Sequence, residues 1–189
     1  QMLFDRNVAM KSKSFAIGVR AEHRQDMIDE AMYGRKERGP LGAAAYKLTA
    51  QLENGRGVYT FCMCPGGYVV NASSEQGRLA VNGMSYHDRA GENANSAVIV
   101  TVTKDDYGSD HPLAGMEFQR RLEKKAWEEG GGNVPIQRFA DFCTGTISVK
   151  TGNVTPNIKG KYVFGKVRLS LIHISEPTRY ISSGTCRID

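Results

Sequence analysis

The pattern of apolar and polar positions predicts a chain rich in strands, with a few helices. Apolar residues alternate with small or polar ones over residues 15–22, which is the period of a half-buried strand. Residues 25–33 follow the helical period instead, and Gly34 is well placed to end that helix. Further strands are expected at 45–52, 57–64, 68–72, 79–81 and 97–103.

The connections between these strands are short and carry turn residues. Asn54-Gly55 separates two of the predicted strands, and Pro65-Gly66-Gly67 separates the next two. Short connections of this kind join antiparallel neighbours, because a parallel crossover needs a much longer segment. The sheet is therefore expected to be mostly antiparallel.

Two helices are predicted after the strands. The first spans residues 113–129, with Asp110 as its expected cap. The second is expected to begin at Pro135, with an inward-facing apolar stripe that includes Phe139 and Cys143. Strands followed by helices indicate an α+β fold, in which two to three helices pack on a mostly antiparallel sheet.

Composition and charge narrow the class of protein. The 189 residues are 40% apolar and 24% charged, as in a globular protein with its own core. No wholly apolar run is longer than four residues, as in 97–100, so no membrane helix is expected, and no signal-peptide pattern is present. Four cysteines favour a reducing cytoplasm. The net charge of +5 is spread along the chain, which argues against a nucleic-acid partner.

The segment 59–67 (YTFCMCPGG) is the first candidate site. On a regular strand Cys62 and Cys64 share one face about 6.5–7 Å apart, at or beyond the reach of a disulfide. Their spacing is not that of a C-x-x-C redox centre, and no second Cys or His pair completes a metal site. The two side chains either pack inside a sheet or precede a glycine turn that a cofactor or substrate approaches closely.

Two further groups of polar residues are candidates. Residues 73–95 form a dense polar block between strands, whose members are either turn formers or the lining of a site. Arg20 and Glu22 share one face of the first strand, where they form either a structural ion pair or an anion-binding arginine with a supporting carboxylate. The basic run 120–125 is typical of a solvated helix face.

Several motifs are absent. No G-x-G-x-x-G follows a strand, so the chain is not expected to hold a dinucleotide pyrophosphate in the Rossmann manner. The phosphate-binding P-loop, the G-x-S-x-G nucleophile elbow and the zinc motif H-E-x-x-H are absent as well.

Three segments together resemble a known family. They are SFAIGVRAEHRQDMIDEAMYG, YTFCMCPGGYVVNASSEQGRLAVNGMSYHDRAGENANSAVIV, and GMEFQRRLEKKAW followed by VPIQRFADF. In their order and spacing over residues 10–142 they closely resemble the bacterial FAD-dependent dehydrogenases, also described as NAD(P)/FAD-dependent oxidoreductases. The combination of F-C-M-C-P-G-G with N-G-M-S is the most specific part of the resemblance.

The resemblance implies that this chain is a fragment. Family members are considerably longer, and their FAD-binding domain is split between glycine-rich segments near the two ends. Residues 1–168 resemble the middle, the inserted substrate or cap domain of a two-domain flavoprotein that covers the flavin. Its partners would be a small-molecule substrate and the missing FAD-binding halves, and an exposed apolar surface is expected where those halves pack.

The family's flavin performs the hydride chemistry, with NAD(P) as an optional second cofactor, and no catalytic residue transfers to this chain. The fragment alone is expected to be inactive and not to retain FAD. The candidate flavin-facing or substrate-facing residues are Arg20, Glu22, Cys62, Cys64, Gly66, Gly67, Glu75, Asn82, Ser85 and Arg89.

The C-terminal segment differs from the rest. Residues 169–179 (LSLIHISEPTR) resemble the translation of an adapter used in sequencing libraries, as if a truncated metagenomic reading frame had run into it. Residues 169–189 are then expected to be a non-native tail; the alternative is an ordinary apolar strand with a loop.

Two other function classes stay open at this point. One is a stand-alone module that binds an anionic ligand or a nucleic acid. The other is a thiol-redox protein that uses Cys62 and Cys64.

Overall fold

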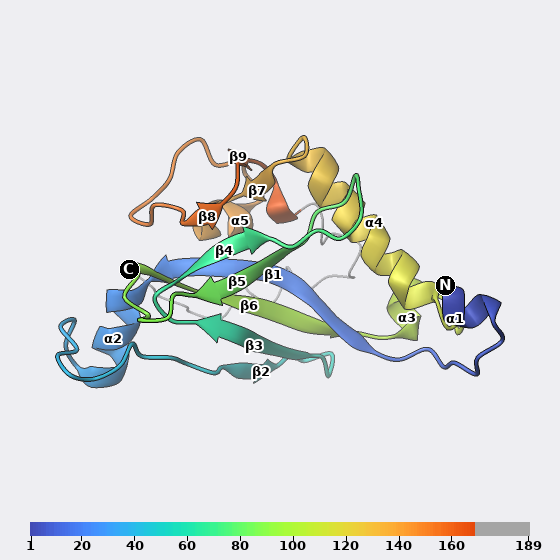
Figure 1. Cartoon of the computed structure of the whole chain (residues 1–189), viewed down its shortest axis with the longest axis horizontal. Helices are drawn as coiled ribbons and strands as arrows, with labels where there is room; N and C mark the ends of the chain where they lie inside the picture. Colours follow the sequence, from blue (N-terminus) through green and yellow to red (C-terminus); the bar gives the residue numbers. More distant parts are fainter. Residues whose placement is uncertain (169–189) are drawn as a thin grey trace.

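A computed structural model describes residues 1–168, and the tail expected at 169–189 lies outside the described residues. A four-stranded antiparallel sheet forms the centre of the fold (Figure 1), in the order β1-β6-β3-β2. Its strands are β1 (Phe15–Arg24), β6 (Asn93–Val102), β3 (Gly57–Cys64) and β2 (Thr49–Gln51). The β1–β6 register runs from Phe15↔Val102 to Arg24↔Asn93, so the first strand pairs along its whole length with a strand far away in sequence.

Two smaller sheets lie beside this one. One has the order β5-β4-β8, from strands β4 (Gly67–Asn71), β5 (Val81–Ser85) and β8 (Ile158–Lys159), with β4 and β8 parallel. The other is a parallel pair of β7 (Val134–Ile136) and β9 (Tyr162–Phe164). In Figure 1, β4 and β5 lie in front of the central sheet, and β7–β9 lie above β1.

The described residues also form helices α1 (Met2–Asp5), α2 (Gln25–Tyr33), α3 (Lys104–Tyr107), α4 (Ala114–Glu129) and α5 (Phe139–Thr144). Helix α2 begins directly after β1 and ends at Gly34, whose φ of 71° is the left-handed conformation that favours glycine. This mixture of helices with antiparallel strands confirms the predicted α+β class. None of the described helices is both long and apolar enough to cross a bilayer.

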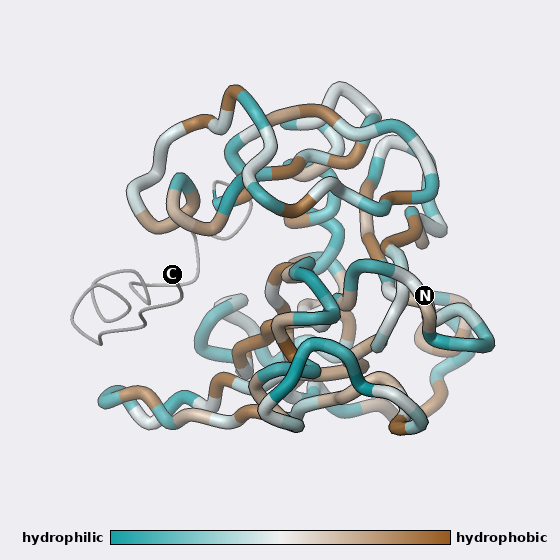
Figure 2. The backbone as a smooth tube through the Cα atoms, turned by 90° about the vertical axis from the view of Figure 1, so that its left-hand side faces the viewer, coloured by the Kyte–Doolittle hydropathy of each residue, from teal (hydrophilic) through white to brown (hydrophobic). Residues whose placement is uncertain are grey.

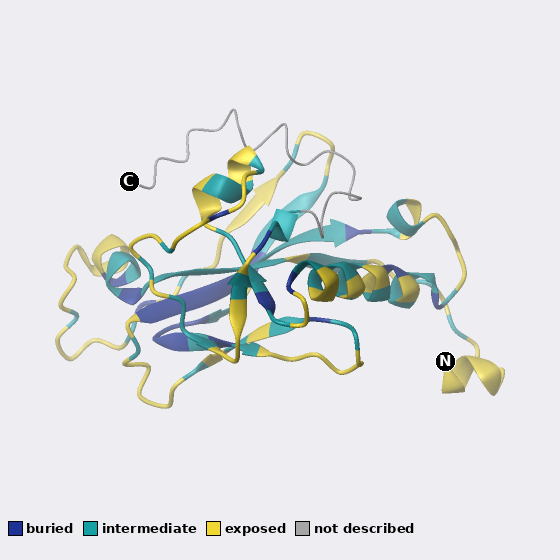
Figure 3. Ribbon diagram, turned by 90° about the horizontal axis from the view of Figure 1, so that it is seen from above, coloured by how far each residue is buried: buried dark blue, intermediate teal, exposed yellow. Residues whose placement is uncertain are grey.

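The best-buried apolar contact joins the central sheet to α4. Val102 and Phe118 are 0% and 3% exposed, and Phe15, Ile17, Tyr107 and Leu122 pack around them. Figure 3 shows that fully buried positions follow the strands, whereas the helices are exposed along their outer sides. Large apolar side chains such as Val149 (84% exposed) and Phe61 (57% exposed) lie at the surface.

Of the predicted strands, 57–64 has the bounds expected of it, whereas 15–22 extends to Arg24, 68–72 is Gly67–Asn71 and 97–103 is Asn93–Val102. The other two predicted strands are largely replaced. Of 45–52, Thr49–Gln51 alone is a strand, and 79–81 is replaced by Val81–Ser85. In both cases tertiary bonds occupy the backbone. The N–H of Leu48 donates to the side-chain Oγ1 of Thr60, and the N–H of Leu79 donates to the carbonyl of Glu123 on α4.

The helix predicted from Pro135 is wrong at its start, because residues Val134–Ile136 pair with β9 and helix α5 begins at Phe139. The core-facing stripe is wrong as well, since Phe139 is 62% exposed and Cys143 is exposed. Asp110 does not cap α4; it forms an ion pair with Lys104 at 3.0 Å, and the N-cap residue of α4 is Leu113.

Candidate functional site

A groove of about 930 Å³ runs beside the edge strand β1. Its lining includes the consecutive residues Ile17–Glu22, so both faces of this strand border it. Residues of the segment 134–168 line the opposite side, among them Ile136, Val154 and Phe164. In Figure 2 the backbone of β7–β9 and α5 is set above that of the central sheet. The volume and the aliphatic lining are those of a site for a small organic molecule.

The charged residues in this lining are mostly cationic. Arg20, Arg138 and Arg168 line the groove with a single carboxylate, Glu22, within the described part of the chain. Arg138 has Asp141 at 3.8 Å, whereas Arg168 donates to the carbonyl of Cys143. The groove therefore combines apolar walls with excess positive charge.

Arg20 is the centre of a polar cluster, called here the Arg20 cluster, which consists of Arg20, Cys62, Asn82 and Asn95. Nη1 of Arg20 donates to Oδ1 of Asn95 at 2.7 Å and to the carbonyl of Cys62 at 3.2 Å. Nη2 donates to Oδ1 of Asn82 at 3.2 Å. One guanidinium thus joins β1, β3, β5 and β6.

Gly83 makes room for this cluster. A Cβ atom at this position would lie 2.1 Å from Oδ1 of Asn95 and 2.3 Å from Nη1 of Arg20. The glycine of the N-G-M-S segment is therefore needed because β5 passes directly over the Arg20–Asn95 pair.

Asn95 is left with an unpaired donor. The residue is 0% exposed, and its Nδ2 has no hydrogen-bond partner among the described residues. The donation from Arg20 fixes the orientation of the amide, so Oδ1 cannot exchange places with Nδ2. A buried N–H without an acceptor costs about 1–3 kcal/mol, and such a group calls for a physical explanation.

The prediction that Cys62 and Cys64 share one face is wrong. The register between β3 and β6 shifts between Phe61 and Cys64, which is a β-bulge, and Cys62 lies in the left-handed region with φ 47°. The extra residue leaves Cys62 exposed and Cys64 buried. The Sγ of Cys64 donates to the carbonyl of Cys62 at 3.2 Å.

The glycine turn after the bulge is held against the segment that follows β5. A Cβ atom on Gly66 (φ 50°) would lie 2.0 Å from the carbonyl oxygen of Arg89. Arg89 itself has φ 51°, and the N–H of Gly91 donates to the carbonyl of Gly66. Left-handed backbone at residues other than glycine is costly, and it gathers at functional sites.

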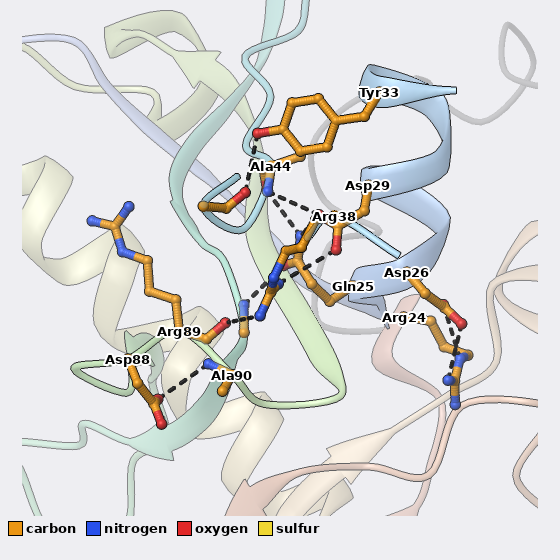
Figure 4. A network of polar contacts seen from close by, with 12 residues as sticks. Arg24, Gln25, Asp26, Asp29, Tyr33, Arg38, Ala44, Asp88, Arg89 and Ala90 are labelled. Atoms are coloured by element: carbon orange, nitrogen blue, oxygen red, sulfur yellow. Dashed lines mark hydrogen bonds and ion pairs between the residues drawn. The ribbon is translucent and has the colours of Figure 1, made fainter. Parts of the chain in front are cut away.

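Helix α2 anchors the same turn through a buried polar network (Figure 4). Oε1 of Gln25 accepts from the N–H of Gly66, and its Nε2 donates to Asp29 and to the carbonyl of Ala44. Arg38 then connects Asp29 at 3.4 Å with the carbonyl of Arg89 at 3.3 Å. Gln25 and Asp29 are each 3% exposed, so this network is part of the core.

Glu22 does not pair with Arg20. Its Oε1 accepts from Nδ2 of Asn93 and from the backbone N–H of Asn157, each at 2.9 Å. Burial raises the pKa of this carboxyl, although both hydrogen bonds act in the opposite direction. The structural ion-pair interpretation is therefore wrong for the described structure, and Arg20 has no carboxylate partner within it.

Comparison with known proteins now assigns the family. A family model described as FAD-dependent protein, C-terminal domain-like, matches residues 14–177. The chain belongs to this FAD-dependent family. It is also 51% identical over 172 residues to an uncharacterized protein of Clostridium beijerinckii (strain ATCC 51743 / NCIMB 8052). That match covers 89% of this chain and 32% of the relative, so the chain spans about a third of the relative's length.

The other predicted site residues of this FAD-dependent family member lie in different places. Ser85 pairs with Gly67 in the β4–β5 ladder, next to the Gly66 turn. Glu75 has no hydrogen bond or ion pair with the Arg20 cluster in the described structure; it forms ion pairs with Arg78 and with Arg120 of α4. Asn82 lies on a strand, whereas the sequence predicts a loop there.

Sequence reasoning did not single out Gln25, Asp29 or Arg38. Gln25 and Asp29 are four residues apart on a predicted amphipathic helix, where two polar groups on an inward face are the available signal. Asn95 was part of the polar block, but its pairing with Arg20 depends on the β1–β6 register. Among the described residues no group of three or more His, Cys, Asp or Glu side chains is arranged to hold a metal ion.

Proposed function

We propose that this chain is the part of an FAD-dependent oxidoreductase that covers the flavin and shapes its substrate site. The family assignment supports the flavoprotein class. The main support is that the Cys62 bulge and the segment 82–89 lie side by side. Arg20 donates hydrogen bonds to Cys62 and to Asn82, and Gly66 lies against the carbonyl of Arg89. Both segments contain residues that the family resemblance makes candidates for the flavin-facing or substrate-facing surface.

The described residues do not fit a pyrophosphate site. Such a site needs a glycine-rich turn between a strand and the helix that follows it. Here β1 enters α2 at Arg24 without a glycine, and β6 enters α3 through Thr103. This supports the proposal that other parts of a longer parent bind FAD, and that residues 1–168 are an inserted cap domain.

In the parent, the flavin supplies the hydride chemistry when it is bound. The residues of this chain orient the substrate and exclude water from it. Apolar groove walls displace water, and the guanidinium of Arg20 provides a fixed positive charge beside them. NAD(P) as the electron partner remains an expectation from the resemblance alone.

A domain exchange tests this proposal. The segment of the Clostridium beijerinckii relative that matches this chain is replaced by residues 1–168, and the chimera and the 189-residue chain are purified side by side. We expect the chimera to carry stoichiometric FAD, seen as flavin absorption that remains after gel filtration, and the chain alone to carry none. A chimera that folds without FAD while the unaltered relative retains it overturns the proposal, as does tight FAD binding by the chain alone.

A further inference from the structure

We infer that the groove takes a carboxylic acid with an apolar body, and that Arg20 binds its carboxylate through Nε and Nη2. The inference rests on the proposed function, because it names the class of substrate for that site.

Arg20 has more N–H donors than it has acceptors in the described structure. A guanidinium has five N–H groups in a rigid plane. Three of them donate to Asn95, Cys62 and Asn82. The N–H on Nε and one N–H on Nη2 have no acceptor among the described residues.

Arg20 has no carboxylate partner in the described structure, and all three of its acceptors are neutral amide or carbonyl oxygens. The unpartnered Nδ2 of Asn95 belongs to the same cluster and is also a donor. The unpartnered groups on Arg20 and Asn95 are N–H donors, so the missing partner is an acceptor, and the uncompensated charge favours an anion.

The two free donors of Arg20 suit the shape of a carboxylate. Nε and Nη2 lie on the same edge of a guanidinium and match the two oxygens of one carboxylate. This chain already contains that arrangement, because Nε and Nη2 of Arg24 bind Oδ1 and Oδ2 of Asp26 at 3.0 Å each. Two remaining donors and one charge suit a monocarboxylate better than a phosphate, which has three oxygens and a higher charge.

The groove beside Arg20 is lined by aliphatic side chains. Arg20 lines the same groove as Val81 of β5 and as Ile99 of β6, which pairs with Gly18 on the Arg20 face of β1. An anion held at Arg20 therefore continues into aliphatic surroundings, which favour a hydrocarbon chain or ring over a sugar or a nucleotide.

The test uses octanoate as the probe and octanamide as its uncharged match. Each is titrated into the 189-residue chain and into the chimera described above, with calorimetry as the readout. We expect octanoate to bind more tightly than octanamide, and Arg20→Gln to weaken octanoate by about 10- to 100-fold without changing octanamide. Arg24→Gln is the matched control, because its fork is occupied by Asp26, and it should leave both affinities unchanged.

Equal binding of the two probes, or equal octanoate binding by wild type and Arg20→Gln, overturns the inference. Tighter binding of octyl phosphate than of octanoate overturns the carboxylate assignment in favour of phosphate. Unchanged octanamide binding by Arg20→Gln establishes that the groove is still folded. FAD retention by the chimera does not depend on these titrations, so a chimera that holds FAD but ignores octanoate refutes this inference alone.

Discussion

Gly83 lies so close over Arg20 that a methyl group on the glycine would stand 2.3 Å from Nη1 of the guanidinium. The same methyl group would stand 2.1 Å from Oδ1 of Asn95, the acceptor of the shortest hydrogen bond in the Arg20 cluster. Neither neighbour can withdraw without breaking a bond. The glycine on β5 and the arginine on β1 are therefore mutually dependent.

Gly83→Ala is predicted to destabilise the protein by about 1–3 kcal/mol, because relief of the clash costs hydrogen bonds of a charged group. It should also weaken octanoate binding. Chemical denaturation and calorimetry measure the two effects. The matched control is Gly42→Ala, where a Cβ meets nothing within 4 Å and φ is not left-handed. Equal stabilities of the two variants would contradict the described packing of β5.

Gly66→Ala tests the turn that follows the bulge. The substitution adds strain at φ 50° and a contact of 2.0 Å with the carbonyl oxygen of Arg89. We expect a loss of about 2 kcal/mol or more in the free energy of unfolding, from strain and clash together. Gly77→Ala serves as control, because Gly77 has φ 71° with open space around it and so isolates the strain alone. A loss no greater than that of the control would show that the turn has room.

Arg56 and Asp106 should contribute more to stability than any exposed ion pair. Arg56 donates to both oxygens of Asp106, which is 4% exposed and also accepts from the N–H of Thr103. Asp106→Asn is expected to cost about 1.5–3 kcal/mol in urea unfolding, the range for hydrogen bonds to charged groups. Asp110→Asn, which breaks an exposed pair with Lys104, should cost less than about 1 kcal/mol.

The same pair predicts behaviour in acid. The hydrogen bonds from Arg56 hold the pKa of Asp106 below its usual range. A carboxyl with a lowered folded-state pKa stabilises the fold above its unfolded pKa of about 3.9, and that contribution disappears as the pH falls through the folded value. Wild type should therefore lose stability below about pH 4 more steeply than Asp106→Asn. Parallel acid-unfolding curves would be the contrary result.

His23 predicts a second pH dependence, near neutrality. Burial lowers the pKa of this imidazole, and its Nε2 is 2.7 Å from the hydroxyl of Tyr46. Because the folded state binds the proton less readily, His23 stabilises the fold above its unfolded pKa of about 6.5 and loses that effect as the pH falls below it. His23→Gln should flatten the stability profile between about pH 5 and 7. Tyr46→Phe should keep the slope, since burial is the principal cause, and lower stability by about 1 kcal/mol at every pH.

The thiols can be ranked by reagent access. In a Cys186→Ser background, native-state alkylation should label the exposed Cys62 and Cys143 and spare the buried Cys64 until the protein unfolds. Mass spectrometry of the labelled peptides reads this out. The bulge argues against the thiol-redox hypothesis, because it leaves Cys62 exposed and Cys64 buried. A reversible Cys62–Cys64 disulfide in the folded protein would instead support that hypothesis.

Local periodicity predicted the elements whose burial pattern is regular. Strand 57–64 and helix 25–33 have the bounds expected of them, because alternation and helical spacing are properties of neighbouring residues. Residues 134–136 pair in parallel with a strand about 28 residues later in the chain. The pattern of neighbouring residues contains no signal for pairing at that distance. The bulge at Cys62 could not be predicted either. A regular and a bulged strand can have the same sequence, but the extra residue of the bulge changes the face on which the following side chains lie.

The sequence was enough to predict several residues of the candidate site, but not the contacts between them. The sequence singled out Arg20, Cys62 and Asn82, which the fold brings together across three strands. Glu75 looked equivalent within the polar block, yet it is bound to Arg120 on α4. Such outcomes depend on which strands become neighbours, and that is a property of the whole topology.

The position of β1 has a consequence for handling the protein. As an edge strand of ten residues, β1 has a second side that no described backbone segment pairs with. Such a side accepts another extended chain by main-chain bonds alone, whatever its side chains. Concentrated solutions of the 189-residue chain are therefore expected to form dimers or longer assemblies through this strand. For a preparation that precipitates, we would first add a short peptide that pairs with β1, or substitute a proline on the unpaired side of this strand.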